Sequence, residues 1–473
     1  MRLRRRNVLK LLSYSVAGLA ATGLRPRSAS AKTTVIEREV CVIGGGSSGT
    51  FTAVNLRDAG KSVVVLERKQ RLGGHTETYV DPATGIPTDY GVVVFNHLPV
   101  VSEYFARFNV PLISLPPDAF GGPNVNVDFR TGQTQTFSEP TQAEAGQALG
   151  AYFGYLQQLS ATYFDLDKSS DLPNPVPADL IMRFGDFVTK YGLGAMVRNA
   201  FQFGQGVGDL LNMPTVYVLK NFSSAVVGSI FSGNFVVCPF GNSTIYEKAT
   251  QLLGDDVVFG AEVERVERNR HGVVVTVGTQ QGRVIVKAKK LVVTCPPTLD
   301  NLCSFDLDQA ESRTFSRFRS NYYYTGLIKL DNIPAGLSVT NSSSLTAYNL
   351  PQLPGIYGIN PTRVPGIWNV KFGSTVPLSE FDVKATIVSQ IRRLSDPVYF
   401  PSRPRVREFV TFTGHNPFEL HVAGDDIAQG FYGSLNALQG RNRTFYNGAA
   451  FQTHDSSLIW QYTKSTVLPL LLA

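Results

Sequence analysis

The distribution of apolar residues after residue 38 predicts a strand, a helix and a second strand in close succession. Residues 39–43 form a short, mostly β-branched apolar run, which is typical of a buried parallel strand. Residues 44–49, Gly-Gly-Gly-Ser-Ser-Gly, follow it, and the next positions predict a helix that ends at Gly60. A second apolar run, residues 63–66, ends at Glu67. The pattern therefore indicates a β-α-β unit with a glycine-rich turn before its helix.

Other segments carry their own periodicity. Alternation of apolar and polar positions predicts strands, and longer apolar periodicity with start and stop signals predicts helices. In chain order, helices are expected over residues 140–159 and 179–207, a β-meander over 257–297, strands at 322–324 and 356–359, and a last helix over 457–468 stopped by Pro469.

The β-α-β unit carries the features of a dinucleotide-binding site. Gly44 permits the tight turn, Gly46 lets a pyrophosphate approach the backbone, and Gly49 lets helix and strand pack closely. The phosphates would lie at the helix N-terminus, where Ser48 stands. Glu67, at the end of the second strand, is placed to accept the ribose hydroxyls.

The same residues allow a competing interpretation. Residues 45–49 also match G-x-S-x-G, the nucleophile elbow of an α/β-hydrolase, which likewise joins a strand to a helix. A hydrolase needs several strands before its elbow. Residues 1–31 are expected to be removed as an export signal, as described below, so only about a dozen residues of the mature chain precede residue 45. It also needs Asp and His partners that the sequence does not suggest. Dinucleotide binding is therefore favoured.

The residues after the second strand identify the dinucleotide. Residues 67–75, Glu-Arg-Lys-Gln-Arg-Leu-Gly-Gly-His, resemble the extended FAD motif of the flavin amine oxidase and phytoene desaturase superfamily. In that motif a Gly-Gly doublet and usually an arginine follow the acid, and His75 replaces the arginine here. The resemblance places Lys69 near the adenosine ribose, and Gly73, Gly74 and His75 along the FAD toward its isoalloxazine end.

Two further segments resemble the same superfamily. Residues 85–91, which include Asp89 and Gly91, are similar to the hairpin that passes beside the flavin. In the predicted meander, the resemblance makes Val263 the position whose backbone meets the adenine. Residues 291–297 resemble the strand that returns to the FAD-binding domain.

Two segments compete for the C-terminal flavin motif. Residues 422–426 look like an A-G-D motif, whereas residues 444–450 resemble the segment written F-x-A-G-E in amine oxidases. We favour the second, because the last predicted helix follows it directly. It places Gly448 and Ala449 against the flavin, with Ala449 in the position of the customary acid.

The same resemblance assigns the neighbouring residues. The N-terminus of the last helix, with Ser457 and Leu458, would face the N1/O2 edge of the flavin. Phe445 and Tyr446 would form the flavin-side wall of the substrate pocket and are the candidate catalytic residues. A core position for these two aromatics is equally compatible with the sequence.

The resemblance implies an α/β fold with a Rossmann-like FAD-binding domain, an inserted α+β substrate domain and a helical cap. The FAD-binding domain is expected to be discontinuous, over residues 36–98, 235–300 and 440–473, with the substrate and cap domain over 99–234 and 301–439. FAD is the expected cofactor.

The chemistry is less sharply defined by the sequence. Many amine oxidases carry a lysine that holds water beside the flavin N5, but Thr325 or Gly326 occupies that position here, and Lys329 comes too late. Three features resemble a sub-branch that contains polyenoic fatty-acid isomerases and fungal FAD-dependent dehydrogenases. They are the missing lysine, His75, and the short segments at residues 418–421 and 438–440. Three functions remain: oxidation by hydride removal, redox-neutral isomerisation of an unsaturated fatty acid, and a non-catalytic carrier. The intact glycines and Glu67 disfavour the carrier. Net oxidation of a hydrophobic small molecule is favoured over isomerisation, because it is commoner in the superfamily.

Composition and charge indicate an N-terminal targeting segment and argue against nucleic acid as a partner. The chain of 473 residues is 43% hydrophobic and 17% charged, as in a folded globule. Residues 1–31 hold seven basic and no acidic residues, which account for the whole formal net charge of +7. The remainder is neutral, so a small-molecule substrate is expected rather than nucleic acid. Neither the histidines nor the cysteines show metal-ligand spacing.

The N-terminal segment has the features of an export signal. Arg5 and Arg6 begin a segment similar to the twin-arginine consensus, an apolar stretch covers residues 11–24, and Ala-Ser-Ala at residues 29–31 supplies a cleavage site before Lys32. The alternative is a membrane anchor, for which the stretch is short and polar. The sequence therefore predicts engagement of the export machinery, removal of residues 1–31, and a periplasmic or secreted protein.

Overall fold

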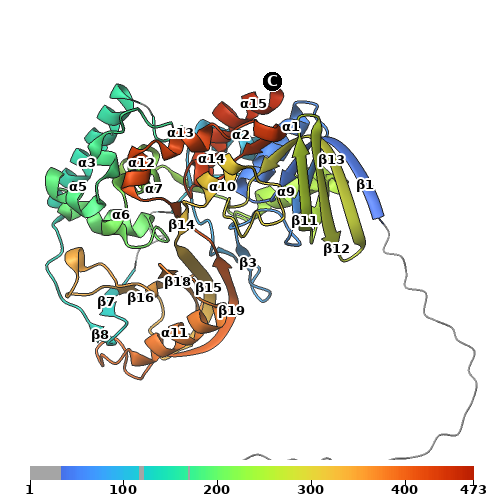
Figure 1. The fold of residues 1–473 in the computed structure, drawn as a ribbon. Coiled ribbons are helices and arrows are strands. Elements are labelled where there is room, and N and C mark those ends of the chain that lie inside the picture. The colour runs from blue at the N-terminus through green and yellow to red at the C-terminus, as the bar shows by residue number, and fades with distance from the viewer. Residues whose placement is uncertain (1–32, 117–121, 164, 169–170) are drawn as a thin grey trace, which may run out of the picture.

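The computed structural model describes residues 33–116, 122–163, 165–168 and 171–473. The predicted export signal lies outside these residues. Figure 1 shows three parts: a sheet that contains β1, a group of helices around α3, and a second sheet beside α11.

The first sheet forms around the predicted β-α-β unit. Its β1 lies between β2 and β13 and runs parallel to both. The apolar residues that predicted these strands are buried, from Val40 to Ile43 and from Val63 to Leu66. In order across the sheet, the strands are β10 (Val257–Phe259), β2 (Val63–Glu67), β1 (Thr33–Ile43), β13 (Gly282–Val293), β12 (Gly272–Thr279) and β11 (Glu262–Asn269), with β21 (Thr444–Tyr446) added beside β13.

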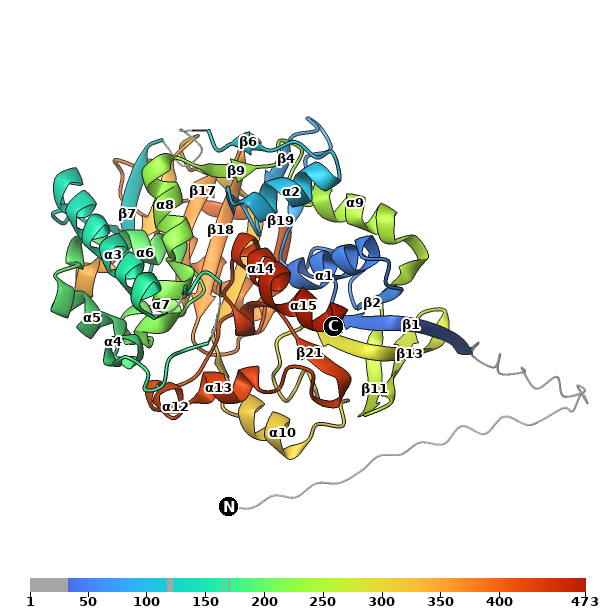
Figure 2. The same ribbon diagram turned by 90° about the horizontal axis from the view of Figure 1, so that it is seen from above.

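Helices pack around α1, which follows the first strand of this sheet. Figure 2 shows α1 beside α14 and α15, with α9 on its other side, and the packing contacts agree. Their bounds, with that of the neighbouring α2, are α1 (Ser47–Asp58), α2 (Pro99–Arg107), α9 (Thr244–Leu253), α14 (Ser456–Tyr462) and α15 (Leu468–Leu472).

The last predicted helix does not stop at Pro469. A π-helical turn, Thr463–Val467, joins α14 to α15, and Pro469 stands in the first turn of α15. Proline is tolerated in a first helical turn because the N–H that it lacks has no partner there. The expectation of a stop was therefore wrong.

The second sheet separates an apolar face from a polar one. Its outward face packs Ile328, Val370 and Phe372 against α11 (Glu380–Arg393) in a closed apolar core. The sheet runs in the order β19 (Arg405–His415), β15 (Tyr322–Asp331), β18 (Ile367–Ser374), β17 (Gly355–Pro361), β16 (Ser338–Asn341), β7 (Asn124–Asp128) and β8 (Gln133–Thr134).

The remaining elements form the helical cap and the connections. The cap contains α3 (Gln142–Thr162), α4 (Ala178–Ile181), α5 (Phe184–Tyr191), α6 (Val197–Phe203), α7 (Thr215–Asn221) and α8 (Ser224–Ser232). The connections contain the pairs β3 (Thr78–Val80) with β4 (Pro87–Asp89) and β14 (Arg319–Ser320) with β20 (Leu420–His421), the small sheet β5 (Phe95–Asn96), β9 (Phe235–Val237) and β6 (Ile113–Ser114), and α10 (Gln309–Phe315), α12 (Gly424–Ala428) and α13 (Phe431–Asn436). The predicted α/β fold class is confirmed. No helix among the described residues is long and apolar enough to span a membrane.

Candidate functional site

A cavity of about 1700 Å³ runs from the carboxyl ends of the first sheet's parallel strands to the second sheet. Its wall includes the turn after β1, the end of β2 and the segment after β21, together with residues of β15, β17 and β18. Ligands of α/β sheets bind at this end of the strands. The volume exceeds the roughly 300–1,000 Å³ of an ordinary ligand pocket. It therefore has room for a dinucleotide and a second molecule.

The glycine turn has the geometry that its sequence predicts. Gly44 has a backbone φ of +100°, and a Cβ there would lie 2.6 Å from the Thr294 hydroxyl oxygen. A Cβ on Gly49 would lie 1.9 Å from the Gly44 carbonyl oxygen, so helix and turn are packed as closely as a glycine allows. Both positions exclude a side chain.

Gly46 differs from these two because it borders open space. The nearest atom to a Cβ built there is the Gly74 Cα, at 3.8 Å. The protein leaves this space empty, and both Gly46 and Ser48 lie on the cavity wall. Helix α1 begins here with no side-chain cap and no acidic residue in its first turn. A pyrophosphate fits this position, because its charge is attracted by the N-terminal backbone N–H groups.

The acid at the end of β2 is held rigidly on the wall. Glu67 is 6% exposed. One carboxylate oxygen accepts the Gly45 N–H at 2.6 Å and the other accepts the Lys69 N–H at 2.7 Å. The Lys69 ammonium lies on the wall and pairs with Glu77 at 3.1 Å. Glu67 is thereby oriented to accept further hydrogen bonds from ribose hydroxyls.

The glycine doublet and the following hairpin close around the same space. A Cβ on Gly74 would come within 2.9 Å of the Gly46 Cα, and one on Gly91 within 2.0 Å of the His75 carbonyl oxygen. The Asp89 carboxylate accepts the Asn242 N–H at 3.0 Å, and burial raises the pKa of Asp89 to about 6.

Most of the residues assigned to the cofactor by resemblance meet at this one cavity. They come from the glycine turn, the doublet, the hairpin, the meander and the C-terminal segment. The wall contains Gly44, Gly46, Ser48, Glu67, Lys69, Gly73, Gly74, His75, Asp89, Gly91, Val263, Gly448 and Ala449. Gly49 lies behind it, where it packs against the turn.

The structure separates the two C-terminal candidates. Strand β21 runs parallel to β13, and the residues after it, Asn447 to Ala450, lie on the wall. Gly424, from the competing segment, packs in α12 instead, where a Cβ would lie 2.5 Å from the Ile181 carbonyl oxygen. The geometry favours residues 444–450.

Ser457 and Leu458 do not lie on the wall, which corrects the sequence assignment. Both side chains are buried, and both backbone N–H groups donate to one Asp455 carboxylate oxygen, at 2.7 and 3.2 Å. An acid directly before the helix therefore uses the donors that the prediction assigned to the flavin. His454, Asp455 and Ser456 lie on the wall in their place.

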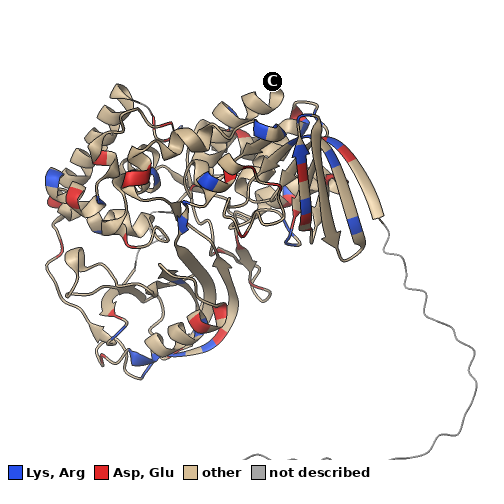
Figure 3. Cartoon of the chain, viewed as in Figure 1, with Lys and Arg blue, Asp and Glu red and all other residues tan. Residues whose placement is uncertain are grey.

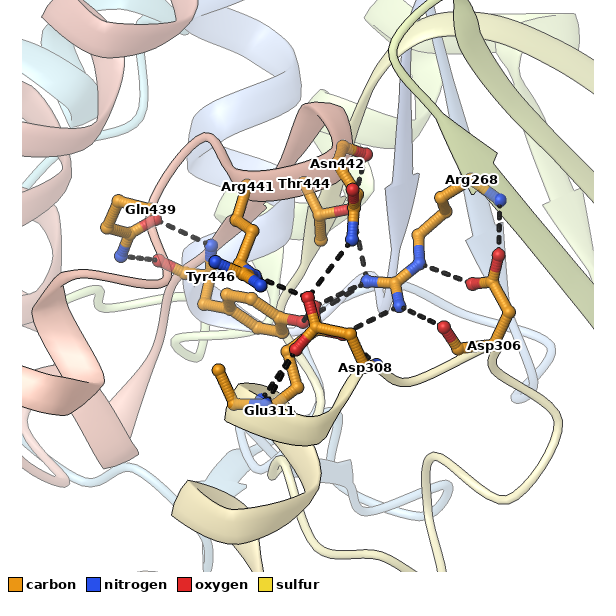
Figure 4. Close-up of polar contacts among 10 residues, drawn as sticks. Arg268, Asp306, Asp308, Glu311, Gln439, Arg441, Asn442, Thr444 and Tyr446 are labelled. Atoms are coloured by element: carbon orange, nitrogen blue, oxygen red, sulfur yellow. Dashed lines mark hydrogen bonds and ion pairs between the residues drawn. The ribbon is translucent and has the colours of Figure 1, made fainter.

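Phe445 and Tyr446 are also absent from the wall. Figure 4 shows the polar contacts that Tyr446 makes instead. The Tyr446 hydroxyl donates to Glu311 at 2.7 Å, and Glu311 in turn pairs with Arg268 at 2.7 Å. Phe445 lies beneath the Lys290 ammonium, 5.6 Å from the ring centre. Because β21 adds to the first sheet, both aromatics belong to its core, and their assignment to a catalytic wall was wrong.

The far end of the cavity is lined by the inward face of the second sheet and the loops beside it. Tyr323, Tyr357, Lys371 and His415 lie on this wall. The rings of His75 and His415 stack with centres 4.1 Å apart. Burial lowers the pKa of His415 to about 3, so this imidazole is neutral at physiological pH.

A second histidine lies nearby with a defined tautomer. The His454 Nε2 donates to the Phe418 carbonyl oxygen at 2.8 Å, which leaves Nδ1 as an acceptor. Its ring stacks on Phe418 with centres 3.9 Å apart, and burial lowers its pKa to about 4. This residue was missed from the sequence, because the loop before α14 has no periodic pattern to mark it.

Lys371 and Asn369 were also missed, although their strand carries a usable signal. Trp368, Val370 and Phe372 alternate with them, as in a strand with one polar face. Such a face normally contacts water, and only the structure shows that it contacts a cavity. Within the described residues, no group of three or more His, Cys, Asp or Glu side chains could hold a metal ion.

Charge on the first sheet is mixed rather than concentrated. Figure 3 shows both signs of charge on this sheet: β11 carries acidic and basic residues, β12 carries neither, and basic residues of β13 pair with acidic residues of β1 and β11. Several of them pair, as Arg283 does with Glu264 at 2.9 Å. The meander therefore presents no basic stripe of the kind that contacts nucleic acid.

Comparison with known proteins gives the same assignment. Residues 47–330 match the family model described as flavin-containing amine oxidoreductase. The chain is 38% identical to the FAD-dependent oxidoreductase oblC of Cochliobolus heterostrophus, over 99% of each chain. It is 34% identical to the beta-cyclopiazonate dehydrogenase of Aspergillus oryzae, over 91% of this chain and 92% of the relative.

Solved structures share the fold. A CLA-producing fatty acid isomerase from P. acnes superposes with a TM-score of 0.73 at 18% identity, over 91% of this chain and 98% of the isomerase. A variant putrescine oxidase superposes with a TM-score of 0.64 at 18% identity, over 93% of this chain and 100% of the oxidase. With the glycine cradle, the fixed acid and the curated relatives in agreement, the chain belongs to the flavin-containing amine oxidoreductase family and is an FAD-dependent oxidoreductase.

Proposed function

We propose that this enzyme oxidises a hydrophobic small molecule by hydride removal, with net dehydrogenation of the substrate. The main support is the continuity of one cavity from the glycine cradle to a wall of aromatic residues on the second sheet. FAD bound in the cradle supplies the hydride acceptor. The relative named as a dehydrogenase favours net oxidation over isomerisation.

The protein's own groups orient the substrate and exclude water. Burial raises the pKa of Tyr323 and of Tyr357, so both phenols remain neutral. The lowered pKa values of His415 and His454 keep both imidazoles neutral as well. Neither histidine is a strong base, which favours direct hydride removal over prior deprotonation of carbon. A dry wall protects the electron-poor carbon from water.

The proposal is tested with the purified FAD-loaded protein and a panel of hydrophobic amines, unsaturated fatty acids and polyenes. Under anaerobic conditions, a molecule that the enzyme oxidises should reduce the flavin and bleach its absorption. The colour should return only when oxygen or another electron acceptor is added. Product that accumulates with no acceptor consumed, while the flavin remains oxidised, would contradict net oxidation and establish isomerisation.

The cellular location is a separate proposal. We infer from Arg5, Arg6 and the Ala-Ser-Ala site at residues 29–31 that the chain is exported and begins at or near Lys32 when mature. Export of the wild type and of the double variant Arg5→Lys/Arg6→Lys should be compared, with sequencing of the mature N-terminus. Retention of the lysine variant inside the cell supports a twin-arginine signal. Unchanged export contradicts it and indicates a general secretory signal.

A further inference from the structure

We propose that Lys371 binds an anionic group of the substrate, a carboxylate or an ionised enol, so that the enzyme acts on acidic hydrophobic molecules. This inference rests on the proposed function and names its substrate class. It comes from one feature of the cavity, a lysine on the inward face of the second sheet that pairs with no residue that the structure describes.

The register of the second sheet places Lys371 at the centre of the inward face. It lies opposite Thr325 of β15 on one side and opposite Gly358 of β17 on the other. Directly opposed side chains have Cβ atoms about 4.5–5.5 Å apart. Gly358 adds no side chain, and both Lys371 and Gly358 lie on the cavity wall.

This position also lies close to the cofactor end of the cavity. The Thr325 hydroxyl donates to the Tyr90 carbonyl oxygen at 2.7 Å. Tyr90 stands between Asp89 and Gly91, which both lie on the wall beside the glycine doublet. A ligand group held by Lys371 would therefore lie next to the hairpin that borders the cofactor space.

Lys371 has no protein counter-ion. It makes no hydrogen bond or ion pair with any residue that the structure describes. Burial alone lowers its pKa to about 8, and no charged neighbour contributes to the shift. At neutral pH most of the protein therefore carries an ammonium in the cavity, where an uncompensated charge is costly. An anionic ligand group would supply the missing partner.

A second polar atom on the same face also lacks a partner. The His415 Nε2 is buried and has no hydrogen-bond partner among the described residues. His415 lies opposite Tyr323, two residues along β15 from the Thr325–Lys371 pair. Unsatisfied buried polar atoms are rare in folded proteins. This atom, on the same cavity wall as the unpaired Lys371, indicates a polar ligand group at this end.

The test compares anions with their uncharged counterparts. Benzoate and octanoate, against benzamide and octanol, are titrated calorimetrically into the FAD-loaded wild type, Lys371→Met and Lys371→Arg. The wild type should prefer the anions. Lys371→Met should bind them roughly 10- to 100-fold more weakly, the range for a lost charged hydrogen bond. Its affinity for the uncharged molecules should not change, and Lys371→Arg should keep the preference.

Lys329→Met is the matched control, because Lys329 lies on the adjacent strand but pairs with Glu408 at 2.7 Å. It should behave as the wild type. The melting temperature of Lys371→Met should equal or exceed that of the wild type, since an unpaired buried charge is removed. A wild type without anion preference, or a Lys371→Met variant that keeps it, would overturn the inference. Flavin content is measured separately: a colourless protein would instead overturn the proposed function.

Discussion

The space around each glycine of the turn, where another residue would place its side chain, determines what the β-α-β unit can bind. At Gly44 and Gly49 the protein itself fills the position of a side chain, whereas at Gly46 the nearest atom stands 3.8 Å away. The first two glycines are required for folding, and the third is required only by a ligand. Substitution at Gly46 can therefore separate cofactor binding from stability.

Gly46→Val should abolish FAD binding while the protein still folds, because the branched side chain would occupy the pyrophosphate position. Flavin absorption after reconstitution and far-UV circular dichroism measure the two effects. Gly150→Val makes the same chemical change on the exposed side of α3, where a Cβ meets nothing within 4 Å, and should bind FAD normally. Full flavin binding by Gly46→Val would place the cofactor elsewhere.

Glu419 should make stability depend on pH. It is buried, the Asn221 side-chain amide donates to it at 3.3 Å, and burial raises its pKa from 4.5 to about 7. Because the folded state holds this proton more tightly, Glu419 contributes stability below pH 4.5 that is lost as the pH rises to 7. The unfolding free energy of the wild type should fall relative to Glu419→Gln across this window, by on the order of 3 kcal/mol. Parallel urea-unfolding curves at every pH would contradict this.

At the residue scale, the sequence predicted the positions that depend on local backbone geometry. Gly44, Gly46, Gly49 and Glu67 act within one short segment, so their spacing is sufficient. Lys371 could not be predicted in this way, because its neighbours are set by strand register. That register brings it opposite Thr325, 46 positions away in the chain.

At the element scale, the positions of strands in the sequence were predicted more reliably than the strands with which they pair. Residues 444–446 form the expected strand, but its pairing with β13 places Phe445 and Tyr446 in the core of the first sheet. The sequence shows two aromatic residues shortly before a glycine, but it does not show which other elements of the fold bury these two side chains. Similarly, the last helix was predicted, but not the π-helical turn that lets it continue past Pro469.

A buried ion pair joins three elements and should be important for stability (Figure 4). Arg268 of β11 pairs with Glu311 of α10, and both contact Tyr446 of β21. Both charged side chains are fully buried. Glu311→Gln leaves the guanidinium with only the partly exposed Asp306 as its counter-charge, and should destabilise the protein by up to about 3 kcal/mol.

Thermal and urea unfolding measure this effect. Glu264→Gln is the matched control, because Glu264 pairs with Arg283 on the exposed surface of the same sheet. An exposed pair contributes less than about 1 kcal/mol. Equal losses in the two variants would show that the buried pair has no special structural role.

At the scale of the whole molecule, two sheets with different tasks border one cavity. The first contributes the turn, the acid and the C-terminal segment that fit a dinucleotide, and the second contributes an aromatic face with a single lysine. The superfamily resemblance rests on motifs of the first sheet, so it could predict residues only at the dinucleotide end of the cavity. The inward face of the second sheet carries no such motif, so the substrate end had to come from the structure.

The measurement that tests this account most directly is the visible absorption spectrum of the purified wild-type protein, before and after reconstitution with FAD. The account predicts a yellow protein with one FAD per chain, held in the cavity between the sheets and released on denaturation. A colourless protein that takes up no FAD on reconstitution would contradict it, as would a protein that retains NAD instead.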